Sequence, residues 1–154
     1  MINFRTLEKV KWGARLTYYN GIYAFILGVF YIAFFDWILK TNFNALKVIW
    51  SVFAQYNPGI SYLLIKLVIL KGVLVVAISI MIMYLSSFVY RKKDRISWLI
   101  LLIIGIIFWP GLLVMEFLDR NIWTIILASI GWISFIIGVL IPIRYYVIDV
   151  QESY

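Results

Sequence analysis

Three charged residues stand at the ends of long apolar runs, where they are placed to do chemistry close to a membrane. Asp36 ends the first run, Lys71 comes just before the second, and Glu116 ends the third. Two carboxylates and an ammonium group at one depth can form a buried triad, or line a small vestibule that recognises an anionic or zwitterionic headgroup. These three residues and Pro110 are the candidate ligand-binding set.

Each charged member of this set also has a plainer interpretation. Asp36 and Lys40 stand four residues apart, as do Glu116 and Arg120, and this spacing favours ion pairs at helix ends. Because charges delimit every apolar run, a shared depth is also what four spans of similar length must produce. The sequence leaves both interpretations open.

The depth of Lys71 follows from counting along the chain. The 19 residues from Gly72 to Tyr90 carry no charge, and at 1.5 Å per residue they cover about 28 Å of helix. This places Lys71 near the outer edge of the hydrocarbon, where its four-carbon stem can extend to water. A charged residue at that depth is either a ligand contact or a side chain that reaches the interface.

Pro110 is the strongest local breaker of a helix within the third apolar run. Within Trp109-Pro110-Gly111, the proline has no N–H to donate to the carbonyl of Ile106, so we expect a kink. Broken helices line substrate sites in transporters, whereas an isolated proline kink is usually a packing feature.

The composition removes most catalytic chemistry. The chain has no Cys and no His, which excludes disulfides, thiolate nucleophiles and His-based metal, haem or acid–base sites. Its serines therefore have no histidine partner, and Asp36 and Glu116 form an acid–base pair only if the fold brings them together. We expect no cofactor, no metal and no enzymatic activity; a lipid-modifying enzyme that uses Glu116 is a third hypothesis.

The remaining composition indicates a membrane protein. Of 154 residues, 65% are hydrophobic, whereas a soluble domain has about 45–50%. The net charge of +7 comes from bases beside apolar runs, where they set topology and contact lipid headgroups. We therefore expect membrane lipids, and not nucleic acid, as partners.

The apolar runs predict a single all-α domain over residues 1–154, an integral membrane four-helix bundle. The expected spans cover about 16–36, 62–90, 96–117 and 122–144, and they follow a short basic leader at 1–15. The first run has 20 uncharged residues and no obvious cleavage site, which favours an uncleaved span over a signal peptide.

Residues 42–56 predict an amphipathic helix that lies in the outer interface between the first two spans. One face carries Phe43, Leu46, Ile49, Trp50 and Phe53, and the other carries Asn44, Lys47, Ser51 and Gln55. The aromatic face is expected to press into acyl chains. A lid over an outward-facing cavity is the alternative.

Charge counting predicts that both termini are cytoplasmic. Nine of the 14 bases fall in the segments assigned to the inner side and five in those assigned to the outer side. The inner set is Arg5, Lys9, Lys11, Arg15, Arg91, Lys92, Lys93, Arg95 and Arg144. With no address signal visible, the cell (plasma or inner) membrane is the expected location.

Stripes of small residues suggest how the protein acts. They comprise Gly21, Ala24 and Gly28; Gly72, Ser79 and Ser86; and Ala128, Gly131, Ser134 and Gly138. Such stripes let membrane helices approach closely, and they exceed what one bundle evidently needs. We expect a non-enzymatic protein that forms a homo-oligomer or serves as an accessory subunit of a larger membrane complex. The alternative is a small carrier, channel or lipid-binding protein with an outward-facing site at Asp36, Lys71 and Glu116.

Overall fold

The computed structural model describes residues 4–92 and 94–146, and this part of the chain is all-α, as predicted, with no strand. Its helices are α1 (Phe4–Ala33), α2 (Phe35–Ala45), α3 (Trp50–Tyr56), α4 (Pro58–Lys92), α5 (Arg95–Asp119) and α6 (Ile122–Leu140). Helix α1 begins at Phe4, so the described part of the predicted leader is the first turns of the first long helix.

Four of these helices are long and apolar enough to cross a membrane. The candidate spans are Glu8–Ala33, Pro58–Val89, Arg95–Asp119 and Ile122–Leu140. Each overlaps one of the four spans expected from the sequence. The fold is therefore that of a membrane protein with four candidate spans.

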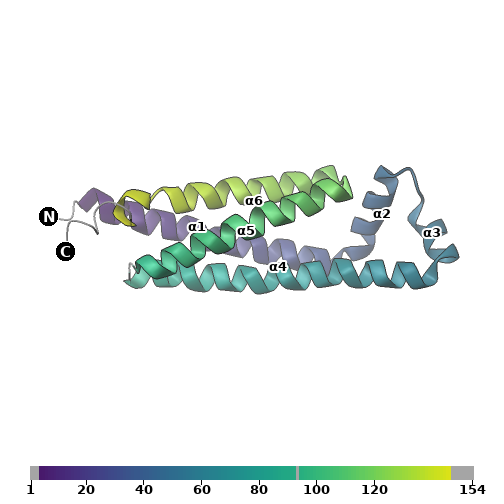
Figure 1. The fold of residues 1–154 in the computed structure, drawn as a ribbon, viewed down its shortest axis with the longest axis horizontal. Helices are drawn as coiled ribbons and strands as arrows, with labels where there is room; N and C mark the ends of the chain where they lie inside the picture. Colours follow the sequence, from purple (N-terminus) through teal and green to yellow (C-terminus); the bar gives the residue numbers. More distant parts are fainter. Residues whose placement is uncertain (1–3, 93, 147–154) are drawn as a thin grey trace.

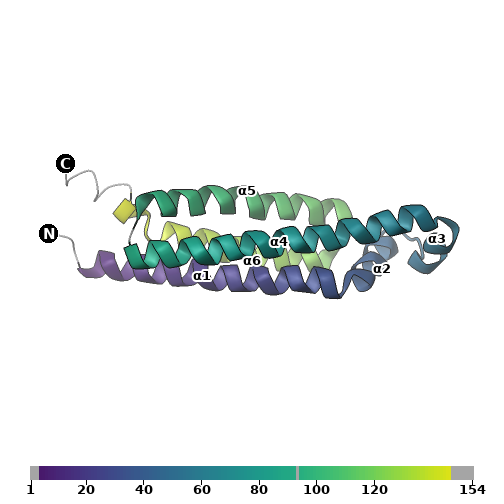
Figure 2. The ribbon, with the colours of Figure 1, turned by 90° about the horizontal axis from the view of Figure 1, so that it is seen from below.

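The four long helices pack side by side in an antiparallel arrangement (Figures 1 and 2). Helix α1 packs against α4 and α6, and α5 packs against α6 and α4. The start of α1 and the end of α6 lie at the same end as the α4–α5 connection (Figure 1). We call this the basic end, because Lys9, Lys11, Arg15, Lys92, Arg95 and Arg144 lie there.

The small residues of α1, α4 and α6 are used for packing inside the chain. A Cβ added to Gly28 would stand 2.8 Å from the backbone nitrogen of Val76, and one added to Gly131 would stand 2.0 Å from the Trp109 ring. Ser79 and Ser86 are fully buried. Close approach at small residues is thus confirmed within one chain, and the stripes supply no argument for contact between chains.

The segment expected to form one interfacial helix at 42–56 is instead two short helices joined by a turn. Lys47 has a φ of 58°, and the backbone N–H groups of Leu46 and Lys47 donate to carbonyls of the last turn of α2, which ends that helix. The ring of Phe43 lies 4.9 Å from Trp50 and 4.8 Å from Phe53 between centroids. The aromatic face therefore packs α3 back onto α2.

These short helices form a cap at the end opposite the basic end. Ile38 and Leu39 of α2 are buried, and Asn121 at the start of α6 donates its Nδ2–H to Oδ1 of Asn42 at 2.9 Å. Helix α4 continues past the α5–α6 turn to meet α3 (Figure 1). We define the cap as residues 34–70: α2, α3, the turn at 46–49 and the first 13 residues of α4, which rise about 20 Å along its axis.

Candidate ligand site at the cap end

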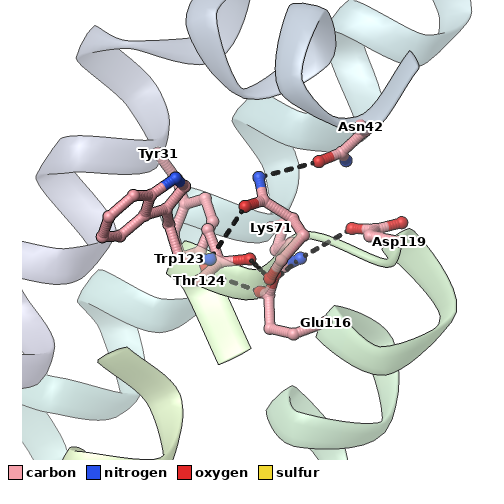
Figure 3. Close-up of polar contacts among 8 residues, drawn as sticks. Tyr31, Asn42, Lys71, Glu116, Asp119, Trp123 and Thr124 are labelled. Atoms are coloured by element: carbon pink, nitrogen blue, oxygen red, sulfur yellow. Dashed lines mark hydrogen bonds and ion pairs between the residues drawn. The ribbon is translucent and has the colours of Figure 1, made fainter. Parts of the chain in front are cut away.

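Lys71 is the centre of a charged cluster that joins α4 to α5 (Figure 3). Its Nζ lies 2.6 Å from Oε1 of Glu116 and 3.2 Å from Oδ2 of Asp119. Two of the three charged residues named from the sequence therefore meet. Within the described part of α4, Lys71 is also the only side chain that forms a hydrogen bond or ion pair with another helix.

Tyr31 of α1 completes the cluster. Its hydroxyl donates to Oε1 of Glu116, and its ring centroid lies 4.9 Å from the Lys71 ammonium. Glu116 is 1% exposed and Tyr31 is fully buried. Since an isolated buried carboxylate is strongly unfavourable, the lysine and the tyrosine hydroxyl are what make a buried Glu116 tolerable.

Local packing explains how these groups come together. Gly72 packs against α1, where an added Cβ would stand 2.8 Å from the Gly28 carbonyl and 3.0 Å from Cβ of Tyr31. This close approach places the neighbouring Lys71 over the Tyr31 ring. Glu116 and Asp119 stand three residues apart in the last turn of α5, so both face the same neighbour.

Asp36 lies outside the cluster. It pairs with Lys40 at 2.6 Å, and both side chains are more than half exposed. The plainer interpretation, an ion pair at a helix end, therefore describes Asp36 as the structure places it. Asp119 takes the position in the cluster that the sequence reasoning had considered for Asp36.

The expected pairing of Glu116 with Arg120 is wrong. Arg120 ends α5 in the left-handed conformation with a φ of 53°, so its side chain leaves the helical register on which i,i+4 spacing depends. Glu116 pairs with Lys71 instead. The signal for the missed residue was the spacing of Glu116 and Asp119, which predicts a shared helix face.

Pro110 is remote from this cluster. Helix α5 continues through it from Arg95 to Asp119, and Gly111 beside it faces open space. Pro110 lies more than one helical turn before Glu116, and nothing among the described contacts joins it to Lys71. Pro110 is therefore not part of the charged cluster.

A second polar network lies at the same end of the molecule and joins α2 to the start of α6. Asn121 is buried, its Oδ1 accepts from the backbone N–H of Trp123 at 3.2 Å, and the hydroxyl of Thr124 donates to its carbonyl (Figure 3). Through its bond to Asn42 it also ties the cap to the α5–α6 turn. The charged cluster itself is built by α1, α4 and α5.

A third network lies deeper in the packed helices and was missed by the sequence reasoning. Asn20 of α1 donates its Nδ2–H groups to the Gly131 carbonyl and to Oγ of Ser134, both at 2.7 Å, and accepts from the indole of Trp109 at 3.2 Å. Its side-chain hydrogen-bonding groups are all engaged. Asn20 therefore links α1 to α5 and α6.

The described residues also show little chemistry of other kinds. Within 4–92 and 94–146 there is no group of three or more metal-ligating side chains. Ser79, Ser86 and Ser87 donate their hydroxyls to carbonyls of their own helix. Comparison of the chain with models of protein families, with curated proteins and with solved structures finds no match.

Proposed function

We propose that the protein is a non-catalytic membrane subunit that works by association, and that its cap binds a partner protein. The observation that supports this proposal is the apolar surface of the cap. Its exposed large apolar side chains are Phe34, Trp37, Leu46, Val48, Ile49, Val52, Tyr56, Ile60, Tyr62, Leu63, Leu67 and Leu70. An exposed apolar surface of this kind is typical of an interaction site.

The bilayer that covers the long helices leaves much of this surface uncovered. From Ile96 to Glu116, 21 residues of helix cover about 31 Å, which is close to the thickness of the hydrocarbon. The charged cluster and the α5–α6 turn therefore lie at the far boundary of the bilayer. The 13 residues of α4 before Lys71 project beyond it together with α2 and α3.

The charge of the cap indicates what kind of surface binds it. Lys40 is neutralised by Asp36, whereas Lys47 and Lys66 form no ion pair within the described residues. A second copy of the chain would bring the same two bases to the interface. An apolar partner surface that carries carboxylates fits better, so the proposed partner is a different protein.

The orientation belongs to the same proposal. Six of the described bases lie at the basic end, which the positive-inside rule assigns to the cytoplasm. The cap then stands on the outer side of a cell membrane, and its partner is a protein with an exposed outer surface.

The test is native mass spectrometry of the protein after gentle extraction from its own membrane. We compare the wild-type protein with the cap double variant Ile49→Ala, Leu63→Ala and with the control Ile107→Ala, Ile133→Ala. The control replaces similarly exposed side chains on the lipid-facing surface of α5 and α6.

The expected result is a stoichiometric second protein on the wild type and the control, and its loss from the cap variant with unchanged helical content. A monomer in all three samples would contradict association. A homo-oligomer in the wild type that dissociates in the cap variant would contradict the proposal that the partner is a different protein.

A further inference from the structure

The charged cluster has the composition of a site for a primary ammonium group. Carboxylates accept its N–H groups, and an aromatic face attracts its charge. The carboxylates of Glu116 and Asp119 belong to α5 and the ring of Tyr31 belongs to α1, whereas the ammonium comes from α4 on a flexible stem. The contacts of Lys71 therefore show that these side chains hold a primary ammonium group.

Asp119 leaves the cluster open on one side. Its side chain is 39% exposed, and only Oδ2 is engaged, at the longer of the two lysine contacts. The buried Glu116 holds Lys71 at 2.6 Å without help from Asp119. A second ammonium group can thus approach Asp119 from outside while the inner ion pair stays intact.

The neighbouring charges select the rest of the ligand. Two carboxylates surround one lysine, which disfavours a purely anionic ligand at Asp119. The exposed Arg120 follows directly, and its guanidinium favours phosphate. A zwitterion that carries an ammonium beside a phosphate matches both residues. The exposed indole of Trp123 marks this level as a membrane interface.

We propose that Asp119 and Arg120, backed by Glu116, Lys71 and Tyr31, bind a phosphoethanolamine group. The source is either the headgroup of phosphatidylethanolamine or a soluble molecule with the same group. This site is separate from the apolar surface of the cap, and the proposal does not depend on the cap having a protein partner.

The first experiment measures lipid retention. The purified protein is placed in nanodiscs that contain phosphatidylcholine with equal small fractions of phosphatidylethanolamine and phosphatidylglycerol, and bound lipids are read by native mass spectrometry. The variant is Asp119→Asn, in which Lys71 keeps its ion pair with Glu116. The matched control is Asp36→Asn, which removes another half-exposed carboxylate at the same end. A second arm measures the thermal shift caused by soluble phosphoethanolamine in nanodiscs of phosphatidylcholine alone.

The wild type and Asp36→Asn should enrich phosphatidylethanolamine over phosphatidylcholine, whose methylated ammonium has no N–H. Asp119→Asn should reduce this enrichment about tenfold, as expected for loss of a charge-assisted hydrogen bond. Enrichment of the lipid identifies a headgroup site, and stabilisation by soluble phosphoethanolamine without enrichment identifies a site for the free zwitterion. Enrichment of phosphatidylglycerol instead, or no response to Asp119→Asn in either arm, would overturn the proposal.

Discussion

At the residue scale, Glu116 and Lys71 stabilise each other in a place where neither is favourable alone. Glu116 is almost fully buried, and the Lys71 side chain is 11% exposed. Removing one partner of such a pair leaves a charge without compensation, while replacing both is often close to neutral. The pair is thus worth more to the specificity of packing than to net stability.

Lys71→Met should therefore lower the free energy of unfolding by about 3–5 kcal/mol, because it leaves Glu116 buried and uncompensated. Adding Glu116→Gln should recover most of this loss, since the glutamine is neutral and its carbonyl still accepts from Tyr31. Denaturant unfolding in detergent, followed by circular dichroism, measures both. Additive losses in the double variant would mean that the two residues do not interact.

A second charged group, Asp94, caps the basic end of α5. The hydroxyl and backbone N–H of Ser97 both donate to its carboxylate, at 2.6 and 3.0 Å, and these bonds lower the pKa of Asp94 below its ordinary value. Because the folded pKa is depressed, the stabilisation is present above the ordinary value of about 3.9 and is lost as the pH falls through the folded pKa.

The carboxyl resonance of Asp94 should therefore titrate below that ordinary value, and Ser97→Ala should move the midpoint upward. Nuclear magnetic resonance of isotopically labelled protein measures this shift. An identical midpoint in the Ser97→Ala variant would show that the hydroxyl does not stabilise the charged carboxylate.

Sequence reasoning at this scale found the residues whose types are costly in a membrane, and missed those whose role depends on contact. Lys71 and Glu116 stand out because charges near apolar runs need a reason. Asn20 did not stand out, although it links three helices, because its role depends on Trp109 and Gly131, which are far away in the sequence. The sequence could not show which of Asp36 and Asp119 contacts Lys71, because that depends on the geometry of the cap.

At the element scale, the two glycines of α5 lie in opposite environments, one packed against a neighbouring helix and one open. A Cβ on Gly105 would stand 1.9 Å from the Phe135 ring, whereas one on Gly111 meets nothing within 4 Å. Both lie in the same helix, so one substitution at two positions compares a crowded face with an open one.

Gly105→Ala should lower the free energy of unfolding by about 1–3 kcal/mol through overpacking. Gly111→Ala should be neutral or raise it by up to about 1 kcal/mol, because alanine favours the helix. Thermal unfolding of the two variants in one detergent tests the contrast. Equal effects would mean that α5 and α6 do not pack as closely as described.

The short helices show why local pattern was an incomplete guide to the elements. The 42–56 segment has a helical period, and most of it is helical. The period cannot show that Phe43 pairs with Trp50 and Phe53, which requires the turn at Lys47. The three aromatic rings of that face pack on one another, whereas Leu46 and Ile49 of the same face stay exposed.

At the scale of the whole molecule, the four spans were predictable because the thickness of the hydrocarbon sets their length. The helix before Lys71 was largely predicted as part of the span at 62–90, but the cap was not, because the sequence does not show that this part of α4 packs with α2 and α3 beyond the charged cluster. This extension is what places an apolar surface beyond the charged cluster. The proposed role of the protein in association depends on that surface.

The most direct test of this role is site-specific photo-crosslinking in the native membrane. A photoreactive phenylalanine analogue replaces Val52 on the cap or, as the control, Ile106 on the lipid-facing side of α5, two side chains of similar exposure. We predict that Val52 gives one adduct with a different protein and that Ile106 gives none. Adducts with a second copy of the chain, or no protein adduct at Val52, would contradict the account.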